Sequence, residues 1–319
     1  MPSFTVAAAT VLLAAASVAA HGEVVGVYAP DGTFYKGFDI WDSSNPDSVG
    51  WATSVTDDGF VGKESYDNFD IACHRDSSPG AISVSVAAGE VLTLEWSTWP
   101  KSHHGPVLDY LAPCGTAGCS TAQKEKLEWF KISEVGIVTP GVGDSGVWGA
   151  DLLIANSFKW QVQIPEGLAA GEYVLRHEII SLHELGAPQH YPQCVNVKVT
   201  SDGGDSVPSG ILATELYAEY VDFNIYQPFE TYPIPGPAMI AGASPILDQG
   251  SGVGLPAAPI EDSEGDFEEG LTTGVDAPAP TPTAPVGGPG GVVVAEPTVT
   301  AAPTRKPCSA RRRNAGAQN

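Results

Sequence analysis

Short runs in which apolar and polar residues alternate recur between residues 21 and 239 of this 319-residue chain. A period of two is typical of β-strands with one buried face. The chain also carries 36 glycines and 27 prolines, which interrupt it too often for long helices. We therefore expect an all-β fold, a two-sheet β-sandwich of the immunoglobulin or fibronectin type with long loops. The clearest runs are residues 82–86, 92–96, 160–164 and 195–199.

Residues 121–132 depart from this alternation, because Gln, Lys, Glu and Leu dominate them. These residue types favour helices. We expect a short helix there, within a loop that connects two strands.

The N-terminal segment is apolar and contains no charge between residues 6 and 20. It is too short to cross a bilayer, and it closes with the small residues Ala19 and Ala20, where a signal peptidase would cut. We expect residues 1–20 to be a signal peptide and His21 to be the first residue of a secreted, extracellular protein. No later segment is long and apolar enough to serve as a membrane anchor.

The C-terminal part of the chain has a different composition. From Ile240 to Asn319 the only aromatic residue is Phe267, and Pro, Gly and Thr are frequent. A segment so poor in large apolar groups cannot offset the entropy lost on ordering. We expect one folded domain over residues 21–239 and a disordered tail over residues 240–319 that carries no binding module.

Five cysteines in a secreted chain predict two disulfides and one unpaired thiol. Cys114 and Cys119 are close neighbours around a glycine-rich turn, so we expect them to pair. Cys73 and Cys194 then form a long-range pair, and Cys308 in the tail stays unpaired.

His21 and His103 are candidate metal ligands. Cleavage before His21 would give that residue two nitrogen donors, its imidazole and its α-amino group. His103 lies in the loop 102–107, where a Gly-Pro turn presents the preceding side chains outward. Three nitrogens in a plane suit Cu(II). The alternatives are a tetrahedral zinc site and a pair of solvated loop histidines that bind no metal.

A third segment adds polar side chains near the end of a predicted strand. With strand alternation, His177, Ser181 and His183 share one face, so both histidines could approach one site. Tyr191 lies close to Cys194, and a phenol held rigidly by a disulfide is a plausible axial group for a metal. A buried core tyrosine with a satisfied hydroxyl is the alternative interpretation.

Taken together, these residues resemble the fungal lytic polysaccharide monooxygenases of auxiliary activity family nine, formerly glycoside hydrolase family sixty-one. The resemblance covers about residues 21–239. It is specific because the motifs occur in the family's order and a histidine falls at the expected mature N-terminus. The matching segments are His21-Gly22 and residues 99–107, 175–194, 224–226 and 232–237.

The resemblance implies a role for several of these residues. One copper ion per chain, cycling between Cu(II) and Cu(I), would be held by His21 through its amine and ring and by His103 through its ring. His104 takes a variable place in the family pattern. Tyr191 matches the axial tyrosine, and two other residues, Gln189 and His183, match polar groups that surround the copper and take part in catalysis. His177 matches no such position and is expected to be structural, and the family's two disulfides agree with the pairing given above.

The resemblance also implies an activity and its partners. The expected enzyme is a copper-dependent monooxygenase that cleaves the β-1,4-glucan chains of cellulose by hydroxylation at C1 and/or C4. It would use O2 or H2O2 and an external electron donor, either a small molecule or an enzyme such as a secreted dehydrogenase. The alternatives are a non-catalytic protein that binds cellulose or cell walls, and a secreted copper-binding protein.

Other interactions follow from charge and from the aromatic residues. The formal net charge of −23 excludes a nucleic-acid site built on phosphate neutralisation, and we expect a monomer without a membrane partner. Without a binding module, the glycan must be held by the domain itself, and aromatic rings stack on sugar faces. Tyr226 is the first candidate for this contact, followed by Tyr232 and then Tyr28. Ordinary edge packing is the alternative for each.

Overall fold

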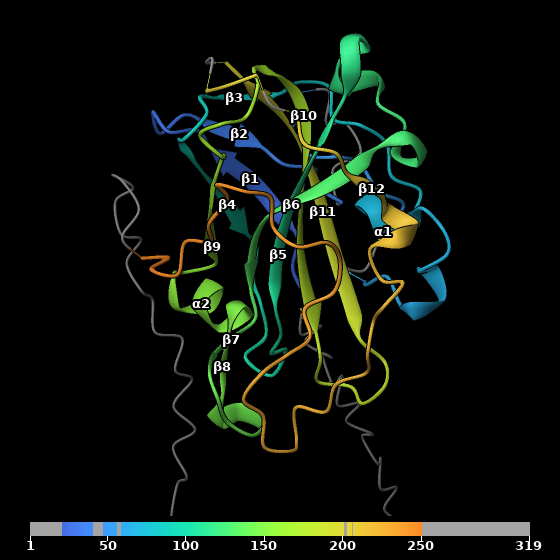
Figure 1. The fold of residues 1–319 in the computed structure, drawn as a ribbon, viewed down its shortest axis with the longest axis vertical. Helices are drawn as coiled ribbons and strands as arrows, with labels where there is room; N and C mark the ends of the chain where they lie inside the picture. The colour runs from blue at the N-terminus through green and yellow to red at the C-terminus, as the bar shows by residue number, and fades with distance from the viewer. Residues whose placement is uncertain (1–20, 41–46, 56–58, 201–202, 206, 251–319) are drawn as a thin grey trace, which may run out of the picture. The chain divides into compact units, whose positions relative to one another are not determined.

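A computed structural model of the chain describes residues 21–40, 47–55, 59–200, 203–205 and 207–250. Two β-sheets pack against each other, which confirms the expected sandwich (Figure 1). The expected signal peptide and residues 251–319 of the expected tail lie outside the described residues. Among the described residues, no helix has the length and apolar character needed to span a membrane.

The smaller sheet has four antiparallel strands in the order β2-β1-β4-β9, and the larger has six in the order β12-β6-β5-β10-β11-β3. Strand β3 pairs parallel with β11, and a short ribbon, β7-β8, stands apart. The strands of the smaller sheet are β1 (Val24–Tyr28), β2 (Phe34–Lys36), β4 (Val91–Trp96) and β9 (Lys159–Gln163). Those of the larger sheet are β3 (Val84–Val86), β5 (Val107–Pro113), β6 (Glu128–Val135), β10 (Gly171–Ser181), β11 (Gln189–Val199) and β12 (Ile211–Leu212). The ribbon consists of β7 (Ile137–Thr139) and β8 (Val147–Trp148).

Helices are short and lie in the connections. The α-helices are α1 (Asp70–Cys73) and α2 (Gly149–Ala155). The 3-10 turns are η1 (Lys63–Ser65), η2 (Gly115–Ala117), η3 (Cys119–Thr121), η4 (Lys124–Lys126), η5 (Gly143–Ser145) and η6 (Ala213–Glu215). The prediction of a single helix over residues 121–132 is wrong, because the range holds the end of η3 and the turn η4, and residues 128–132 belong to β6. Trp129 and Ile132 are buried in that strand, and this burial outweighs the helix propensity of the flanking Lys and Glu residues.

Apolar side chains fill both faces of the larger sheet. One cluster lies between the two sheets and includes Leu94, Leu175 and Val197. The second lies on the outer face of the larger sheet and includes Leu108 and Ile180, under α1 and the long loops. Strands covered on both faces are buried almost throughout, which is why β10 and β11 carry polar side chains only where these have partners.

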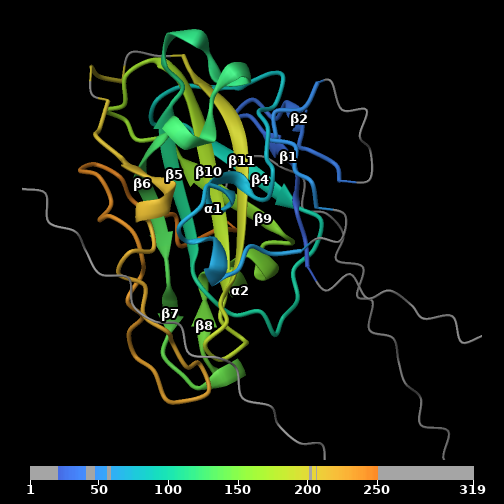
Figure 2. The same ribbon diagram turned by 90° about the vertical axis from the view of Figure 1, so that its right-hand side faces the viewer.

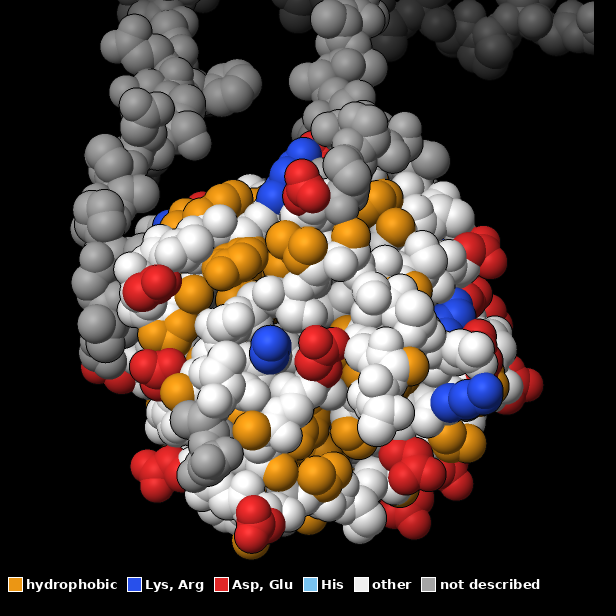
Figure 3. Space-filling model, turned by 90° about the horizontal axis from the view of Figure 1, so that it is seen from above, with side chains coloured by type: hydrophobic (Ala, Val, Ile, Leu, Met, Phe, Trp, Pro, Cys, Tyr) orange, Lys and Arg blue, Asp and Glu red, His pale blue; other side chains and the backbone are white. Residues whose placement is uncertain are grey.

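The long hairpin β10–β11 sets the place of the polar residues noted in the sequence. Its register runs from Gly171 opposite Val199 to Ser181 opposite Gln189. Val107, the first residue of β5, lies beside Ile179, so the loop before β5 reaches the same end of the sheet as the hairpin connection. Figure 2 shows these strand ends together with the β7–β8 ribbon at one end of the sandwich. The opposite end, seen in Figure 3, carries acidic side chains around its rim.

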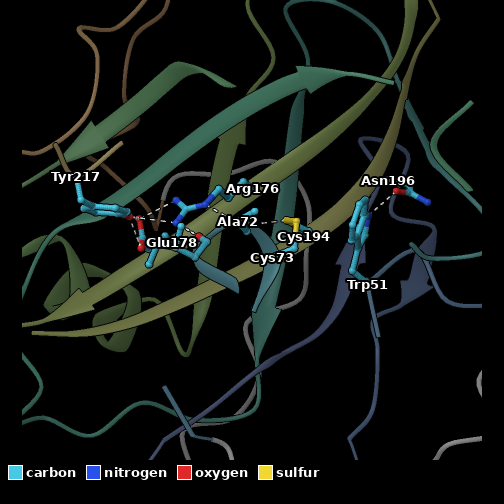
Figure 4. Close-up of a disulfide and its surroundings, with 9 residues drawn as sticks. Trp51, Ala72, Cys73, Arg176, Glu178, Cys194, Asn196 and Tyr217 are labelled. Carbon is cyan, nitrogen blue, oxygen red and sulfur yellow. Dashed lines mark hydrogen bonds and ion pairs between the residues drawn. A yellow bond between two sulfur atoms is a disulfide. The ribbon is translucent and has the colours of Figure 1, made fainter. Parts of the chain in front are cut away.

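Both expected disulfides are present. Cys73 in α1 is bonded to Cys194 in β11, with the Cα atoms 5.2 Å apart, and this bond links the outer helix to the sheet (Figure 4). Cys114 is bonded to Cys119 across the turn between β5 and η3. Cys308 lies outside the described residues.

The folded unit extends beyond residue 239, so the boundary expected there is too early. Ile240 donates its backbone N–H to Lys131 O, and its side chain packs against the core. Gln249 is buried at the edge strand β9, where its Oε1 accepts the Gln161 N–H at 2.7 Å and its Nε2 lies 3.4 Å from Gln161 O. A side-chain amide therefore takes the place of a neighbouring strand and protects this edge.

The Gln249 contact predicts a measurable effect on stability. Gln249→Ala leaves the buried Gln161 backbone groups without these partners, so we expect a loss of about 1–3 kcal/mol in the free energy of unfolding. Leu247→Ala is the matched control, since that side chain belongs to the same segment and is exposed. Denaturant unfolding of both variants measures the difference. Equal midpoints would show that the Gln249 contact with β9 contributes nothing to stability.

Candidate metal centre

His103 is the best-defined polar group at this end of the sandwich. The Trp99 indole N–H donates to His103 O at 3.0 Å, and Ser102 Oγ lies 3.1 Å from His103 Nδ1. The other ring nitrogen, Nε2, is buried and has no hydrogen-bond partner among the residues that the structure describes. A buried nitrogen without a partner is costly unless it binds something. This nitrogen therefore has the chemistry of a ligand atom.

His21 lies next to this nitrogen. The centroids of the His21 and His103 rings are 5.1 Å apart, and the rings are inclined by 67°. The His21 ring also lies 5.3 Å from the ring of Tyr191. In the full chain His21 is joined to Ala20 by a peptide bond. Proteolysis before His21 would turn that amide nitrogen into an amine, a far better metal donor.

His183 is the second histidine that contacts the His103 ring. The two rings stack with centroids 3.9 Å apart and an inclination of 28°. Ser181 Oγ lies 2.6 Å from His183 Nδ1. Because Ser181 and His183 are two residues apart, strand alternation brings both onto the same face at the end of β10.

Tyr191 and Gln189 form the buried wall of the site. The Tyr191 hydroxyl donates to Gln189 Oε1 at 2.8 Å, and both residues lie near the start of β11 on one face of the strand. The Trp99 ring meets the Tyr191 ring edge-on, with centroids 4.9 Å apart. The indole thus fixes the Tyr191 ring with one contact and the His103 backbone with another.

His104 points to a different environment, although it is adjacent to His103. Its Nδ1 lies 2.9 Å from Asp151 Oδ1 in α2, and its Nε2 lies 3.2 Å from the exposed Asp144. The hydrogen bond that His104 donates to the Asp151 carboxylate is the main cause of the raised pKa of His104. A histidine held between two carboxylates has both ring nitrogens occupied and is unsuited to join His103 as a ligand.

His177 is part of the core, as expected. The Trp96 indole N–H donates to His177 Nε2 at 3.0 Å, so Nδ1 carries the proton and donates to Asp109 Oδ1 at 2.7 Å. All three residues are buried between the sheets. His177 and His183 therefore share a strand face, but they do not share a site.

Burial keeps the site histidines in the form that binds metals. Burial, reinforced by the nearby His183, His21 and His104, lowers the pKa of His103 to about 4. Burial also lowers the pKa of His183. A neutral imidazole is the state that coordinates a metal, so His103 is ready to bind throughout the neutral range. Burial raises the pKa of Tyr191, which keeps its phenol protonated.

The donor atoms fit copper. The imidazoles of His21 and His103, with an amine freed by cleavage before His21, would be nitrogen ligands, which copper prefers and which hard cations such as Mg²⁺ and Ca²⁺ do not. The described residues contain no group of three or more His, Cys, Asp or Glu side chains arranged as a metal site. His21, His103 and an amine freed by cleavage before His21 would therefore be the candidate ligand set at this end of the domain.

The three aromatic candidates for glycan contact differ in exposure. Tyr226 is 49% exposed, and its hydroxyl donates to His183 O at 2.8 Å, so it lies beside the site. Tyr232 is only 9% exposed and packs edge-on against Trp148, so the structure contradicts its assignment as a sugar-stacking residue. Tyr28 lies at the end of β1 remote from His21, bonded to Glu95, and is not part of this face.

The sequence reasoning missed the residues that support the site. Trp99, Ser102 and Ser181 orient His103 and His183, but no role had been assigned to them. Ser181 was visible as a polar residue on the His183 face of the strand. Trp99 and Ser102 gave no signal of this kind, since their contacts depend on the path of the loop.

Comparison with known proteins places this arrangement in a family. A model of the family described as Auxiliary Activity family 9 (formerly GH61) matches residues 21–232. The AA9 family lytic polysaccharide monooxygenase A of Malbranchea cinnamomea is 49% identical over 240 residues, which cover 72% of this chain and 71% of that protein. The D enzyme of Podospora anserina is 43% identical over 295 residues, which cover 89% and 82%.

Solved structures agree with this placement. The extended catalytic domain of H. jecorina LPMO9A has a TM-score of 0.65 and 40% identity, over 70% of this chain and 92% of that one. The β-sandwich and the sequence matches define a polysaccharide monooxygenase. The chain belongs to Auxiliary Activity family 9, the AA9 lytic polysaccharide monooxygenases.

Proposed function

We propose that this chain is a secreted, copper-dependent monooxygenase that cleaves β-1,4-glucan chains of cellulose by hydroxylation at C1 and/or C4. The observation that carries the proposal is the buried, unpartnered Nε2 of His103 beside the His21 ring. His21 would bind copper through its amine and ring, and His103 would bind it through Nε2. Tyr191 would be a further residue beside the copper, since its ring lies 5.3 Å from the His21 ring. Bound copper would supply the one-electron chemistry that activates O2 or H2O2.

The balance of the reaction shows which electrons and protons must reach the site. Hydroxylation of one C–H bond with O2 consumes two electrons from an external donor and two protons, and it releases one water. With H2O2 the same product forms without further electrons after the first reduction. The hydroxylated carbon then eliminates its glycosidic partner, so no pair of catalytic carboxylates is required.

The residues around His103 would control protons and position. His183 Nδ1 is engaged by Ser181, so Nε2 is the ring nitrogen that would exchange a proton with a group bound beside His103. The Tyr191 hydroxyl keeps its proton and donates it in a hydrogen bond to Gln189 Oε1, so its oxygen would be a neutral, weak donor toward a metal held beside it. Trp99 would help to keep water away from Tyr191 and His103, because its buried indole contacts both residues. A closed rear wall would leave the solvent side for the glycan.

Partners follow from this chemistry. A small reductant or a secreted dehydrogenase would supply the electrons, and Tyr226 would stack on a glucose unit at the surface. The mature protein would begin at His21 and act as a monomer outside the cell.

The test uses the secreted, mature protein. We expect N-terminal sequencing to start at His21, copper to bind with one ion per chain, and electron paramagnetic resonance to give a type 2 Cu(II) signal. With cellulose and a reductant, oxidised oligosaccharides should appear. Stoichiometric copper without oxidised products would leave a copper-binding protein. A mature chain that does not begin at His21, or that binds no copper tightly, would overturn the proposal.

A further inference from the structure

We propose that Tyr226 is a positioning residue whose hydroxyl fixes His183 at the metal centre while its exposed ring contacts the glycan. Contact with the polymer would then be coupled mechanically to the placement of His183. This inference rests on the proposed function and deepens it, because it assigns the Tyr226 hydroxyl a task separate from that of its ring.

The hydrogen bond from Tyr226 ends on His183, whose ring stacks on the candidate ligand His103. The Tyr226 hydroxyl donates to the backbone carbonyl of His183 at 2.8 Å, across 43 positions of sequence. The ring of the same His183 stacks on His103, and its Nδ1 meets Ser181 Oγ. His183 is therefore held at three places: its ring face, one ring nitrogen and its carbonyl. The last of these depends on a side chain from a surface loop.

The Tyr226 side of this contact is itself fixed. The Tyr226 N–H donates to Asn224 Oδ1 at 2.9 Å, and the Gly143 N–H donates to Ile225 O at 2.6 Å. Gly143 has a positive φ of 49°, and a Cβ built there would lie 3.7 Å from the Tyr226 ring. The loop around Gly143 therefore passes close to the Tyr226 ring.

The ring and the hydroxyl of Tyr226 face different demands. About half of the side chain is exposed, which leaves apolar ring surface for a sugar. A sugar that contacts the ring would push on a side chain whose hydroxyl is hydrogen-bonded to the His183 carbonyl. Since positioning errors of about 1 Å can cost up to about 100-fold in rate, a small change in this bond would be felt at the metal.

A second contact between the same loops gives the matched control. Lys63 Nζ lies 2.7 Å from Asp222 Oδ1 and 3.4 Å from Gly186 O, so it joins the Tyr226 loop to the loop after His183. Both side chains are largely solvated. Such an exposed pair contributes about 0–1 kcal/mol and touches neither His183 nor the metal ligands. Asp222→Asn therefore loosens the same loops without removing the proposed tether.

The experiment compares Tyr226→Phe, Tyr226→Ala and Asp222→Asn in the mature, full-length protein. Binding to cellulose is measured on copper-free protein, and kcat and KM are measured with a soluble cello-oligosaccharide on copper-loaded protein. Paramagnetic resonance reports the copper environment. For Tyr226→Phe we expect cellulose binding and KM within about twofold of wild type, kcat reduced roughly tenfold, and an altered spectrum.

The other variants separate the two tasks. Tyr226→Ala should lose cellulose binding as well as turnover, and Asp222→Asn should match wild type in all three measurements. A Tyr226→Phe protein with wild-type kcat and spectrum would overturn the inference, as would one that loses binding as severely as Tyr226→Ala. Loss of turnover in Asp222→Asn to the same degree would also overturn it, because loose loops would then explain the effect. Wild-type protein without copper or oxidised products would instead refute the proposed function.

Discussion

Replacing His103 by alanine should abolish tight copper binding and the formation of oxidised oligosaccharides, while the same change at the adjacent His104 should leave both in place. The two residues are neighbours in one loop, but their ring nitrogens meet different partners. His103 Nε2 is buried without a partner among the described residues, whereas both nitrogens of His104 meet carboxylates. Only His103 is therefore available as a ligand.

The size of the expected loss follows from the ligand count. Removing a residue that merely supports a ligand typically costs about 10- to 100-fold in metal affinity. His103→Ala removes one of three proposed nitrogen ligands, so we expect a loss of more than about 100-fold. Titration with Cu(II), followed by paramagnetic resonance and isothermal calorimetry, measures it. The variant should remain folded, because the His103 side chain packs at the rim of the core.

His104→Ala is the matched control for this prediction. It removes the bond to Asp151 at the start of α2, so its cost should fall on stability, at about 1–3 kcal/mol. Its copper affinity should stay within about threefold of wild type. Equal loss of copper affinity in both variants would contradict the assignment of His103, since the loop as a whole would then be responsible.

Local patterning explains how much of the fold was predictable. The alternating runs became β3, β4, β9 and β11, because each has one face toward the core between the sheets. The strap of residues 240–250 was not predictable in this way. Its attachment depends on Gln249, a single polar side chain whose partner Gln161 lies 88 residues away. No periodic signal marks a contact of this kind.

The candidate site was predictable in its histidines and tyrosine but not in its surroundings. His21, His103 and Tyr191 stand out because their residue types and spacing match a family pattern. Burial is a property of the whole fold, and it separates Tyr226 from Tyr232, which look alike in the sequence. The tether from Tyr226 to His183 likewise arises only when two distant loops meet.

A second large effect is expected far from the metal, at the buried ion pair between Arg176 and Glu178 on the outer face of β10 (Figure 4). Arg176→Met should lower the free energy of unfolding by about 3–5 kcal/mol at neutral pH, because it leaves a buried carboxylate without its cation. The pair is fully buried, with Arg176 Nη1 2.7 Å from Glu178 Oε2. The Tyr217 hydroxyl also donates to Glu178, and His190 Nδ1 lies 2.9 Å from the other oxygen.

The dependence on pH distinguishes this loss from a simple packing defect. Burial alone raises the pKa of Glu178, but Arg176 and His190 outweigh it and bring the pKa to about 2, below its ordinary value of 4.5. A lowered folded-state pKa stabilises the protein above the unfolded-state pKa, and this stability is lost as pH falls from about 4.5 toward 2. In Arg176→Met the effect of burial on the pKa of Glu178 dominates. Protonation of Glu178 would therefore remove the cost of its buried charge.

The penalty of Arg176→Met should therefore be largest at neutral pH. It should shrink as pH falls toward the ordinary glutamate value of about 4.5, because Glu178 of the variant takes up a proton, and shrink further toward about 2, because the wild type then loses its own stabilisation. Guanidinium chloride unfolding of both proteins across this range measures the difference. Lys63→Met is the matched control, because it breaks an exposed ion pair with Asp222 and should cost less than about 1 kcal/mol. A penalty for Arg176→Met that is equally small, or that stays constant with pH, would show that the buried ion pair does not stabilise the outer face of β10.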